Sequence, residues 1–459
     1  MKSIKLLLIA IASAIFVWGC EKNPVATQNI ISIESFNAIY NGNSKFVLTA
    51  LVQDEATGMI SECGFYLSEN SSLQKATKKE SRLTGSSFSC DVTLENPDVD
   101  YYCCAYISNG RTEICSDLLC IKTEALKDSI VSFEAANSFI VSKAGSYRFK
   151  TVKGNSSTSV GNVYSAEVLW ESFGTSSTPS KGDLINSVSI DDGYIKFSTN
   201  QTYKRGNAVI AAKDASGKIL WSWHIWFTEQ PQEQTYYNNA GVMMDRNLGA
   251  TSATPGNIES FGLLYQWGRK DPFIGSVSAD MPILAESTIT WPSPEESTTE
   301  TGTIAYCISH PTIFIRRNIN NKDWYYSFSE STDNGRWNSS KTIYDPCPAG
   351  WKVPDGGKLG VWATAAGTSE DFIFNFNSIY GGMNFSGKFG DSKTIWYPSI
   401  IFRSSVYGEL APANHDGGCW SVSNDGILAY DFYFLNDNNV SPCSTFSRAL
   451  GAPVRCIKE

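Results

Sequence analysis

The sequence predicts a mostly β protein built of several domains, and three observations support this fold class. Charged residues make up 18% of the chain, whereas aromatic residues reach 13% and include 13 tryptophans. Short apolar runs alternate with polar positions and are separated by turn signals such as Asn41-Gly42, a pattern typical of antiparallel strands. A chain of 459 residues is long enough for about three domains with separate cores. This composition is typical of an extracellular β-rich protein rather than a cytosolic enzyme.

The first twenty residues have the features of an export signal. Two lysines precede an apolar run over residues 6–17, which is too short to span a bilayer because a span takes about 20 residues. The glycine before Cys20 resembles the lipobox of bacterial lipoproteins, which implies that Cys20 is the lipidated first residue of the mature chain. The alternative is an ordinary cleaved signal in which Cys20 is incidental. We therefore expect a signal peptide over 1–20, a tether over 21–27 and a lipid anchor at the outer membrane or cell surface.

Residues 28–124 are predicted to form a first antiparallel β-sandwich. Strand-like runs recur at regular spacing, and the run 101–110 resembles the penultimate strand of fibronectin type III modules, which leads into an Asn-Gly turn. Six cysteines lie in this segment, and export favours disulfides over a zinc site, with fifteen possible pairings. Cys103 and Cys104 are adjacent, so they point to opposite faces of a strand and at most one of them faces the core.

Residues 125–235 are predicted to form a second β-sandwich, with polar linkers over 122–129 and 228–234. In the run 219–227, alternate positions place an apolar set on one face and a mixed set that includes His224 on the other. An exposed aromatic row of this kind could stack on sugar rings. The alternative is that the larger face is half of a sandwich core. His224 is expected to be a packed strand residue rather than a ligand or a base.

Residues 236–459 are predicted to form the last domain, which is organised around a cysteine between two prolines. Each proline lacks an N–H and fixes its own φ, so Cys347 is kept out of a helix or a central strand. We expect Cys347 to pair with Cys456, which would clamp this rigid segment to the last strand-like run. The cross-link would close a loop of about 110 residues and contribute roughly 4–5 kcal/mol by chain entropy.

Several motifs of the last domain occur in the order found in one known family. They lie at residues 243–249, 261–269, 345–354, 419–421 and 448–456. Together they resemble the Fibrobacter succinogenes major paralogous domain, which is found in surface lipoproteins and fimbrillin-related proteins of Bacteroidota. The resemblance implies an α+β fold similar to C-type lectin-like domains, with two helices, a small antiparallel sheet and termini joined by a disulfide.

The calcium-binding pattern of C-type lectins is incomplete in this domain. Those lectins use a Glu-Pro-Asn or Gln-Pro-Asp loop and a Trp-Asn-Asp strand, whereas here Trp420 is followed by Ser-Val-Ser before Asn424 and Asp425. Calcium takes six to eight oxygen ligands, and the sequence does not assemble them, so we expect no metal site and no cofactor. Trp420 is expected to be a core residue of the sheet rather than a sugar platform.

The predicted function is binding at the cell surface by an adhesin or a fimbria-associated protein. A net charge of −9 without a basic stripe argues against nucleic acid as a partner, which leaves a glycan, a protein or a fimbrial subunit. Binding residues concentrate on loops over a rigid scaffold, and exposed aromatic side chains suit carbohydrate or protein recognition. The candidate ligand-binding residues in the last domain are Trp324, Tyr325, Trp337, Trp420, Asn424 and Asp425.

The alternative function is a surface enzyme that acts on glycans with two carboxylates of the last domain. The chain has three histidines and no motif typical of a zinc protease, a serine hydrolase or a phosphate-binding loop, so we expect no catalysis. We expect a disulfide between Cys419 and Cys443, which leaves Cys307 without a partner in this scheme. Cys307 lies three residues before His310, which would suit a nucleophile and its base, although an unpaired or differently bridged cysteine is the favoured interpretation.

Overall fold

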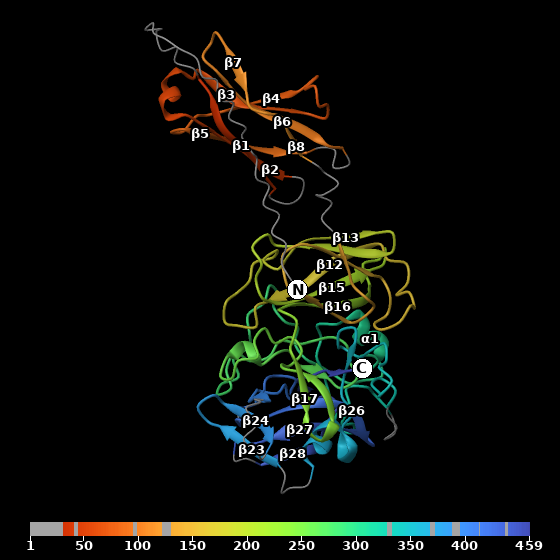
Figure 1. The fold of residues 1–459 in the computed structure, drawn as a ribbon. Helices are drawn as coiled ribbons and strands as arrows, with labels where there is room; N and C mark the ends of the chain where they lie inside the picture. The colour runs from red at the N-terminus through yellow and green to blue at the C-terminus, as the bar shows by residue number, and fades with distance from the viewer. Residues whose placement is uncertain are drawn as a thin grey trace. The chain divides into compact units, whose positions relative to one another are not determined.

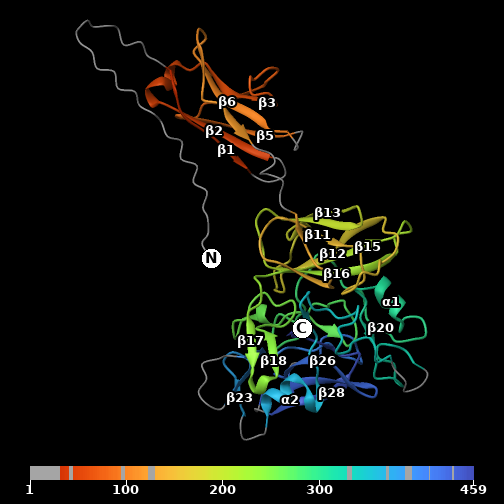
Figure 2. The same cartoon turned by 45° about the vertical axis from the view of Figure 1, so that its right-hand side comes forward.

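The protein, seen here as a computed structural model, divides into two compact units, Met1–Lys127 and Asp128–Glu459 (Figures 1 and 2). The predicted signal peptide with Cys20, the tether and the linker 122–129 lie outside the residues that the structure describes. Within the described part of the chain, no helix is long and apolar enough to cross a membrane. The described residues are 31–40, 45–94, 99–121, 130–327, 333–367, 372–387, 395–412, 414–436 and 439–459.

Two antiparallel sheets face each other across one core in the first unit. One sheet has the order β1-β2-β5 and the other the order β4-β3-β6-β7, with β8 also paired to β6. Side chains from both sheets fill the space between them, among them Leu48, Phe88 and Ile107. The elements are β1 (Ile33–Tyr40), β2 (Lys45–Val52), η1 (Asp54–Met59), β3 (Glu62–Ser68), β4 (Thr77–Ser81), β5 (Ser87–Thr93), β6 (Tyr101–Ser108), β7 (Glu113–Cys115) and β8 (Leu119–Ile121).

In strand β6, successive side chains point alternately into the core and to the outer face of the sheet. Cys103 and Ala105 point into the core, whereas Cys104 and Tyr106 lie on the outer face, as predicted for two adjacent cysteines. Among the described residues of this unit, no disulfide joins two cysteines, so the disulfides expected over 28–124 are not formed. The free thiols are those of Cys63, Cys90, Cys103, Cys104, Cys115 and Cys120.

The second unit begins with another sandwich. Its sheets have the orders β10-β16-β15-β12 and β13-β14-β11-β9. In β16, the alternate residues Trp221, Trp223, Ile225 and Phe227 point into the core between the sheets, which identifies the larger face as half of a sandwich core. The strands are β9 (Val131–Ser132), β10 (Ser138–Val141), β11 (Ser146–Lys150), β12 (Ser165–Ser172), β13 (Ile185–Asp191), β14 (Tyr194–Thr199), β15 (Gly206–Lys213) and β16 (Ile219–Phe227).

The rest of the second unit consists of small sheets joined by long irregular segments. Its first strands pair with its last one in the order β17-β18-β30-β22, so the beginning and the end of this region meet. A second sheet has the order β26-β27-β28. These elements are β17 (Glu233–Tyr236), η3 (Tyr237–Asn239), β18 (Gly241–Met244), β22 (Trp351–Lys352), β26 (Gly417–Asp425), β27 (Leu428–Phe434), β28 (Val440–Ser447) and β30 (Ile457–Lys458).

Shorter pairings and four short helical segments complete this region. Strands β23, β24 and β25 form a three-stranded sheet, β19 pairs with β29, and β20 pairs with β21. The bounds are η4 (Ile258–Ser260), β19 (Tyr265–Gln266), β20 (Glu295–Glu296), α1 (Ile304–Ser309), β21 (Ile315–Arg316), η5 (Gly357–Leu359), α2 (Val361–Ala366), β23 (Phe372–Asn377), β24 (Gly382–Gly387), β25 (Trp396–Pro398) and β29 (Gly451–Ala452).

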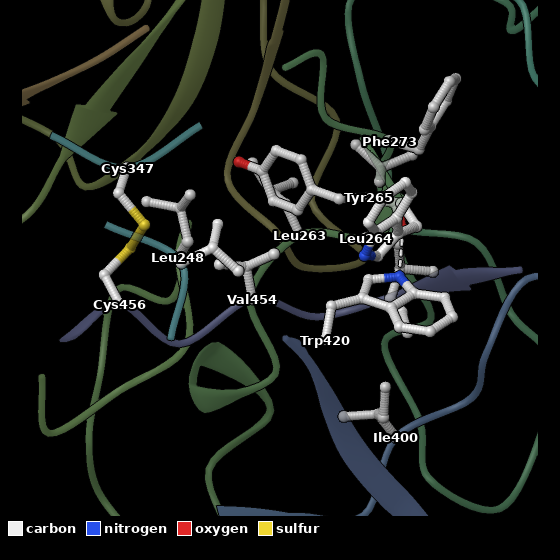
Figure 3. Packing of buried hydrophobic residues seen from close by; sticks show 14 of the residues in the cluster. Leu248, Leu263, Leu264, Tyr265, Phe273, Cys347, Ile400, Trp420, Val454 and Cys456 are labelled. Atoms are coloured by element: carbon white, nitrogen blue, oxygen red, sulfur yellow. Dashed lines mark hydrogen bonds between the residues drawn. A yellow bond between two sulfur atoms is a disulfide. The ribbon is translucent and has the colours of Figure 1, made fainter. Parts of the chain in front are cut away.

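A disulfide joins Cys347 to Cys456 across a sequence separation of 109 residues (Figure 3). The expected bond between Cys419 and Cys443 is absent, because both cysteines are free. Cys419 lies on β26 and Cys443 on β28, with β27 between them. Two strand spacings separate them by about 10 Å, beyond the reach of a disulfide. The Cys419 thiol instead donates to Oδ1 of Asn247 at 3.5 Å.

The outer face of the β16 sheet is covered by the C-terminal region, so the expected boundary near residue 235 lies inside one compact unit. Trp226 is buried in the same cluster as Leu248 and Leu263, and its indole N–H donates to O of Ala250 at 3.0 Å. The Nδ2 amide of Asn137 donates to O of Asp345 at 2.8 Å. Both faces of β16 are therefore internal.

His224 also lies on this covered face and is a packed strand residue. Its Nδ1 is 3.0 Å from Oγ of Ser138, and its Nε2 is 2.9 Å from Oδ1 of Asn207. Burial lowers the pKa of His224 to about 3. The imidazole is enclosed, so solvent and substrates do not reach it.

Candidate functional site

Three of the six predicted binding residues are buried tryptophans. Trp324, Trp337 and Trp420 are each at most 1% exposed. Their indole N–H groups donate to backbone oxygens inside the protein, at 2.7 Å from Trp324 to Trp267, 2.8 Å from Trp337 to Tyr344 and 2.9 Å from Trp420 to Tyr265. A ligand cannot stack on an enclosed ring, so Trp324 and Trp337 are corrected from candidate contacts to core residues. Trp420 is the core residue of the sheet that the sequence analysis favoured over a sugar platform.

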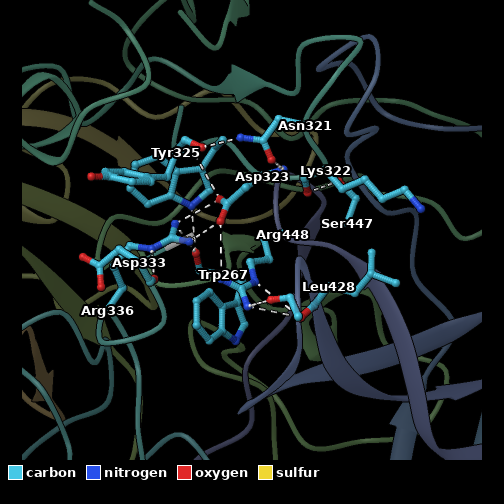
Figure 4. A network of polar contacts seen from close by, with 12 residues as sticks. Trp267, Asn321, Lys322, Asp323, Tyr325, Asp333, Arg336, Leu428, Ser447 and Arg448 are labelled. Carbon is cyan, nitrogen blue, oxygen red and sulfur yellow. Dashed lines mark hydrogen bonds and ion pairs between the residues drawn. The ribbon is translucent and has the colours of Figure 1, made fainter. Parts of the chain in front are cut away.

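The loops that carry the predicted residues nevertheless meet around one buried carboxylate, that of Asp323 (Figure 4). Arg336 donates to both of its oxygens, with Nη1 3.0 Å from Oδ1. Nη1 of Arg448 lies 3.5 Å from Oδ2, and Nη2 of Arg448 donates to O of Gly426 at 2.6 Å. Three loops, residues 321–326, 333–337 and 424–428, meet at this carboxylate, and we call them the Asp323 loop cluster.

Aromatic rings enclose the charges of the Asp323 loop cluster. The guanidinium of Arg336 lies 4.5 Å from the ring centre of Trp324, and that of Arg448 lies 4.3 Å from the ring centre of Trp267. Burial, partly offset by the Asp323 carboxylate, lowers the pKa of Arg448 to about 10, which leaves it charged at neutral pH. Because an unpaired buried charge is strongly unfavourable, these ion pairs hold the loops in one arrangement.

Local hydrogen bonds determine the shape of the first loop. Oδ1 of Asn321 accepts from the N–H of Asp323 at 3.0 Å, and its Nδ2 donates to O of Tyr325 at 2.8 Å. Oγ of Ser447 donates to O of Lys322 at 2.6 Å, which ties the loop to β28. These contacts close a tight turn that presents Lys322 and Tyr325 at its edge.

The remaining predicted residues of the cluster are more accessible to solvent than the three tryptophans. Tyr325 and Asn424 are half-buried, and Asp425 is exposed. The Tyr325 ring stands at 90° to that of Trp324, with ring centres 6.2 Å apart, and lies 5.3 Å from the guanidinium of Arg336. Tyr325 is therefore an aromatic ring that is fixed on one side and open on the other.

Cys307 lies on α1 and His310 directly follows this helix, without the features of a nucleophile and its base. Burial raises the pKa of the Cys307 thiol to about 11, so the thiolate is scarce at neutral pH. His310 stacks on Tyr306 with ring centres 4.0 Å apart, and its Nδ1 is 3.0 Å from O of Tyr306. Among the residues that the structure describes, no three His, Cys, Asp or Glu side chains are grouped to hold a metal ion.

Sequence reasoning selected the aromatic residues of these loops and missed the three charged residues, Asp323, Arg336 and Arg448, on which the cluster is built. Asp323 directly precedes Trp324, and Arg448 begins a C-terminal motif, so each lies next to residues that were singled out. Charged side chains are almost never fully buried unless they are paired. Asp323, Arg336 and Arg448 are up to 125 positions apart in the sequence, so no local pattern indicates that they are in contact.

Comparison with known proteins does not assign a family. No family model and no curated protein matches the chain. Among solved structures, the chain is similar to a family 64 β-1,3-glucanase from Paenibacillus barengoltzii at 10% identity and a TM-score of 0.16, over 39% of this chain and 47% of that one. It is similar to the FN1–FN3 domains of chicken CNTN1 at 10% identity and a TM-score of 0.15, over 45% of this chain and 69% of that one.

A third similar structure is the Bacteroides ovatus protein SGBP-B in complex with a mixed-linkage heptasaccharide. The identity is 11% and the TM-score 0.13, over 41% of this chain and 44% of that one. The chain thus spans about half the length of the glucanase chain. At these TM-scores the likenesses carry no argument about function.

Proposed function

We propose that the protein is a lipid-anchored cell-surface protein that binds a glycan through the Asp323 loop cluster. The observation that carries the proposal is the half-buried ring of Tyr325, held beside Arg336 on a buried ion-pair network. Fixed aromatic rings bind the apolar face of a sugar with little loss of side-chain freedom. Lys322 on the same turn, and Asn424 and Asp425 at the end of β26, provide donors and acceptors for hydroxyl groups.

The proposal includes a lectin-like fold for the C-terminal region and a fibronectin type III-like fold for the first unit. Pairing of β18 with β30 supports the former, because it joins the beginning and the end of the region, and the Cys347–Cys456 disulfide ties the middle of the region to its last strand. A three-stranded antiparallel sheet packed on a five-stranded one supports the latter. The export signal and Cys20 support anchoring. No side chain at the cluster is arranged as a nucleophile, so we propose binding without turnover.

The test is glycan-array binding of the purified chain and two variants at one position. Tyr325→Ala removes the ring and is expected to weaken binding at least tenfold, whereas Tyr325→Phe keeps the ring and most of the binding. The matched control is Tyr407→Ala, because Tyr407 is 74% exposed and lies outside the cluster. Thermal unfolding of each variant shows that it is folded. Equal binding by Tyr325→Ala and the unaltered chain would refute the proposal.

A further inference from the structure

The outer face of the β4-β3-β6-β7 sheet in the first unit brings three cysteines together. Tyr102, Cys104 and Tyr106 alternate with core residues along β6 and so share this face. Cys115 stands opposite Tyr106 on β7, and Cys120 stands opposite Tyr102 on β8. Cross-strand partners point to the same side of a sheet, so Cys104 lies between Cys115 and Cys120.

Cys104 and Cys115 are diagonal neighbours across β6 and β7, because Cys115 stands opposite Tyr106, two residues along β6 from Cys104. Burial, followed by the influence of the Cys115 thiol, raises the pKa of Cys104 to about 12. Cys115 is exposed whereas Cys120 is half-buried, so Cys115 is the more accessible of the two thiols beside Cys104. The two partners differ in access, because Cys104 is buried and Cys115 is exposed. An oxidant from solution therefore reaches the exposed Cys115 first, and the buried thiol of Cys104 beside it can then complete a disulfide.

We propose that Cys104 and Cys115 form a redox site, in which oxidation closes an intrachain disulfide between β6 and the edge strand β7. The oxidant is a small-molecule disulfide such as oxidised glutathione. The site is independent of the Asp323 loop cluster. Cys103 is excluded as a partner because it points into the core, where its Sγ donates to O of Leu119 at 3.7 Å.

The reaction runs in two exchange steps. The Cys115 thiol loses its proton to water, and the thiolate attacks one sulfur of glutathione disulfide, forming a mixed disulfide and releasing a glutathione thiolate. Cys104 then loses its proton, and its thiolate attacks Sγ of Cys115 and releases the second glutathione thiolate. Two protein thiols are oxidised, one glutathione disulfide is reduced, and the two protons end on the released thiolates.

The experiment maps the bond in the purified full-length chain. The chain is incubated with oxidised glutathione at pH 8, remaining thiols are blocked with N-ethylmaleimide, and the protein is digested with trypsin without reduction. Cleavage after Arg111 separates a peptide that contains Cys104 from the peptide 112–122, which contains Cys115 and Cys120. We expect the two peptides to be linked in most chains, and fragmentation to assign the link to Cys104 and Cys115.

Two matched variants on the same peptide make the assignment decisive. Cys115→Ser, at an exposed position, is expected to abolish the linked species, whereas Cys120→Ser is expected to retain it. The proposal is overturned if the wild-type peptides stay unlinked, if the link survives in Cys115→Ser, or if it is lost in Cys120→Ser. It is also overturned if non-reducing electrophoresis shows that Cys115 links two chains instead.

Discussion

Tyr106 in the first unit and Trp226 in the second are both 0% exposed, and both lie on the outer face of a sandwich sheet. Neighbouring side chains of the same sheet cover Tyr106. The ring of Tyr66 is 4.9 Å from it, and Nζ of Lys78 lies 4.3 Å from its centre. Trp226 is instead covered by a second layer of chain, which includes Leu248 and Leu263.

The difference teaches that burial of an outer face has two physical origins. Long side chains such as Lys78 can lie over a ring and keep their charged ends in water, so the sheet remains the surface of its unit. A face such as that of β16 requires another hydrophobic layer, and its polar groups then need internal partners. Ser222 accordingly donates to Oδ1 of Asp271 at 2.6 Å.

The largest expected effect comes from removing the disulfide between Cys347 and Cys456 in the second unit. Replacing both Cys347 and Cys456 with alanine should lower the free energy of unfolding of this unit by roughly 4–5 kcal/mol, because the disulfide closes a long loop. Tryptophan fluorescence in guanidinium titrations measures this unit, since residues 31–121 contain no tryptophan. Cys443→Ala is the control, because this thiol is free and should leave the unfolding midpoint unchanged. Equal midpoints for the double variant and the control would show that the disulfide contributes little.

The next effect compares the two covered rings directly. Trp226→Ala should destabilise the second unit by about 3–5 kcal/mol, because a cavity remains between two packed layers. Tyr106→Ala should destabilise the first unit by roughly 1 kcal/mol, because Tyr66 and Lys78 can close over the space. Urea unfolding followed by circular dichroism and tryptophan fluorescence measures both. Similar losses for the two variants would contradict the distinction between the two kinds of cover.

The last effect depends on pH, is smallest near pH 4, and concerns a carboxyl group that the second unit buries. Asp431 is 2% exposed, and neither oxygen has a hydrogen-bond partner in another residue, so burial raises its pKa well above the usual range. Above about pH 4 the Asp431 carboxyl group keeps its proton in the folded state and loses it in the unfolded state. Its contribution to the free energy of unfolding is therefore greatest below that pH and falls as pH rises towards the folded pKa.

Asp431→Asn should remove this dependence, so that the variant gains about 1 kcal/mol per pH unit relative to the wild type as pH rises from 4. Unfolding free energies measured between pH 4 and pH 8 test this expectation. The control is Asp425→Asn, since Asp425 is exposed on the neighbouring hairpin. Parallel pH profiles for the wild type and Asp431→Asn would mean that Asp431 stays ionised in the fold.

Local signals predicted much of the fold and only part of the candidate site. The period of two in β6 and β16 correctly gave their faces, because neighbouring side chains of a strand must point to opposite sides. The same reasoning could not tell that Trp324 and Trp337 point inward, because a loop has no fixed period. Cys419 and Cys443 were mispaired because no sequence feature shows that β27 runs between their strands.

The sequence by itself determined the β architecture of both sandwiches and the pairing of Cys347 with Cys456. The β architecture follows from alternation along strands and from turn residues, which act over a few residues. The prolines restrict only the backbone around Cys347, and its pairing with Cys456, 109 residues away, is an expectation that the structure confirms. The cover on the outer face of β16, the convergence of three loops on Asp323 and the contact between Cys104 and Cys115 were decided by tertiary structure. Each joins residues through packing, ion pairing or strand register, and such contacts depend on which distant segments become neighbours.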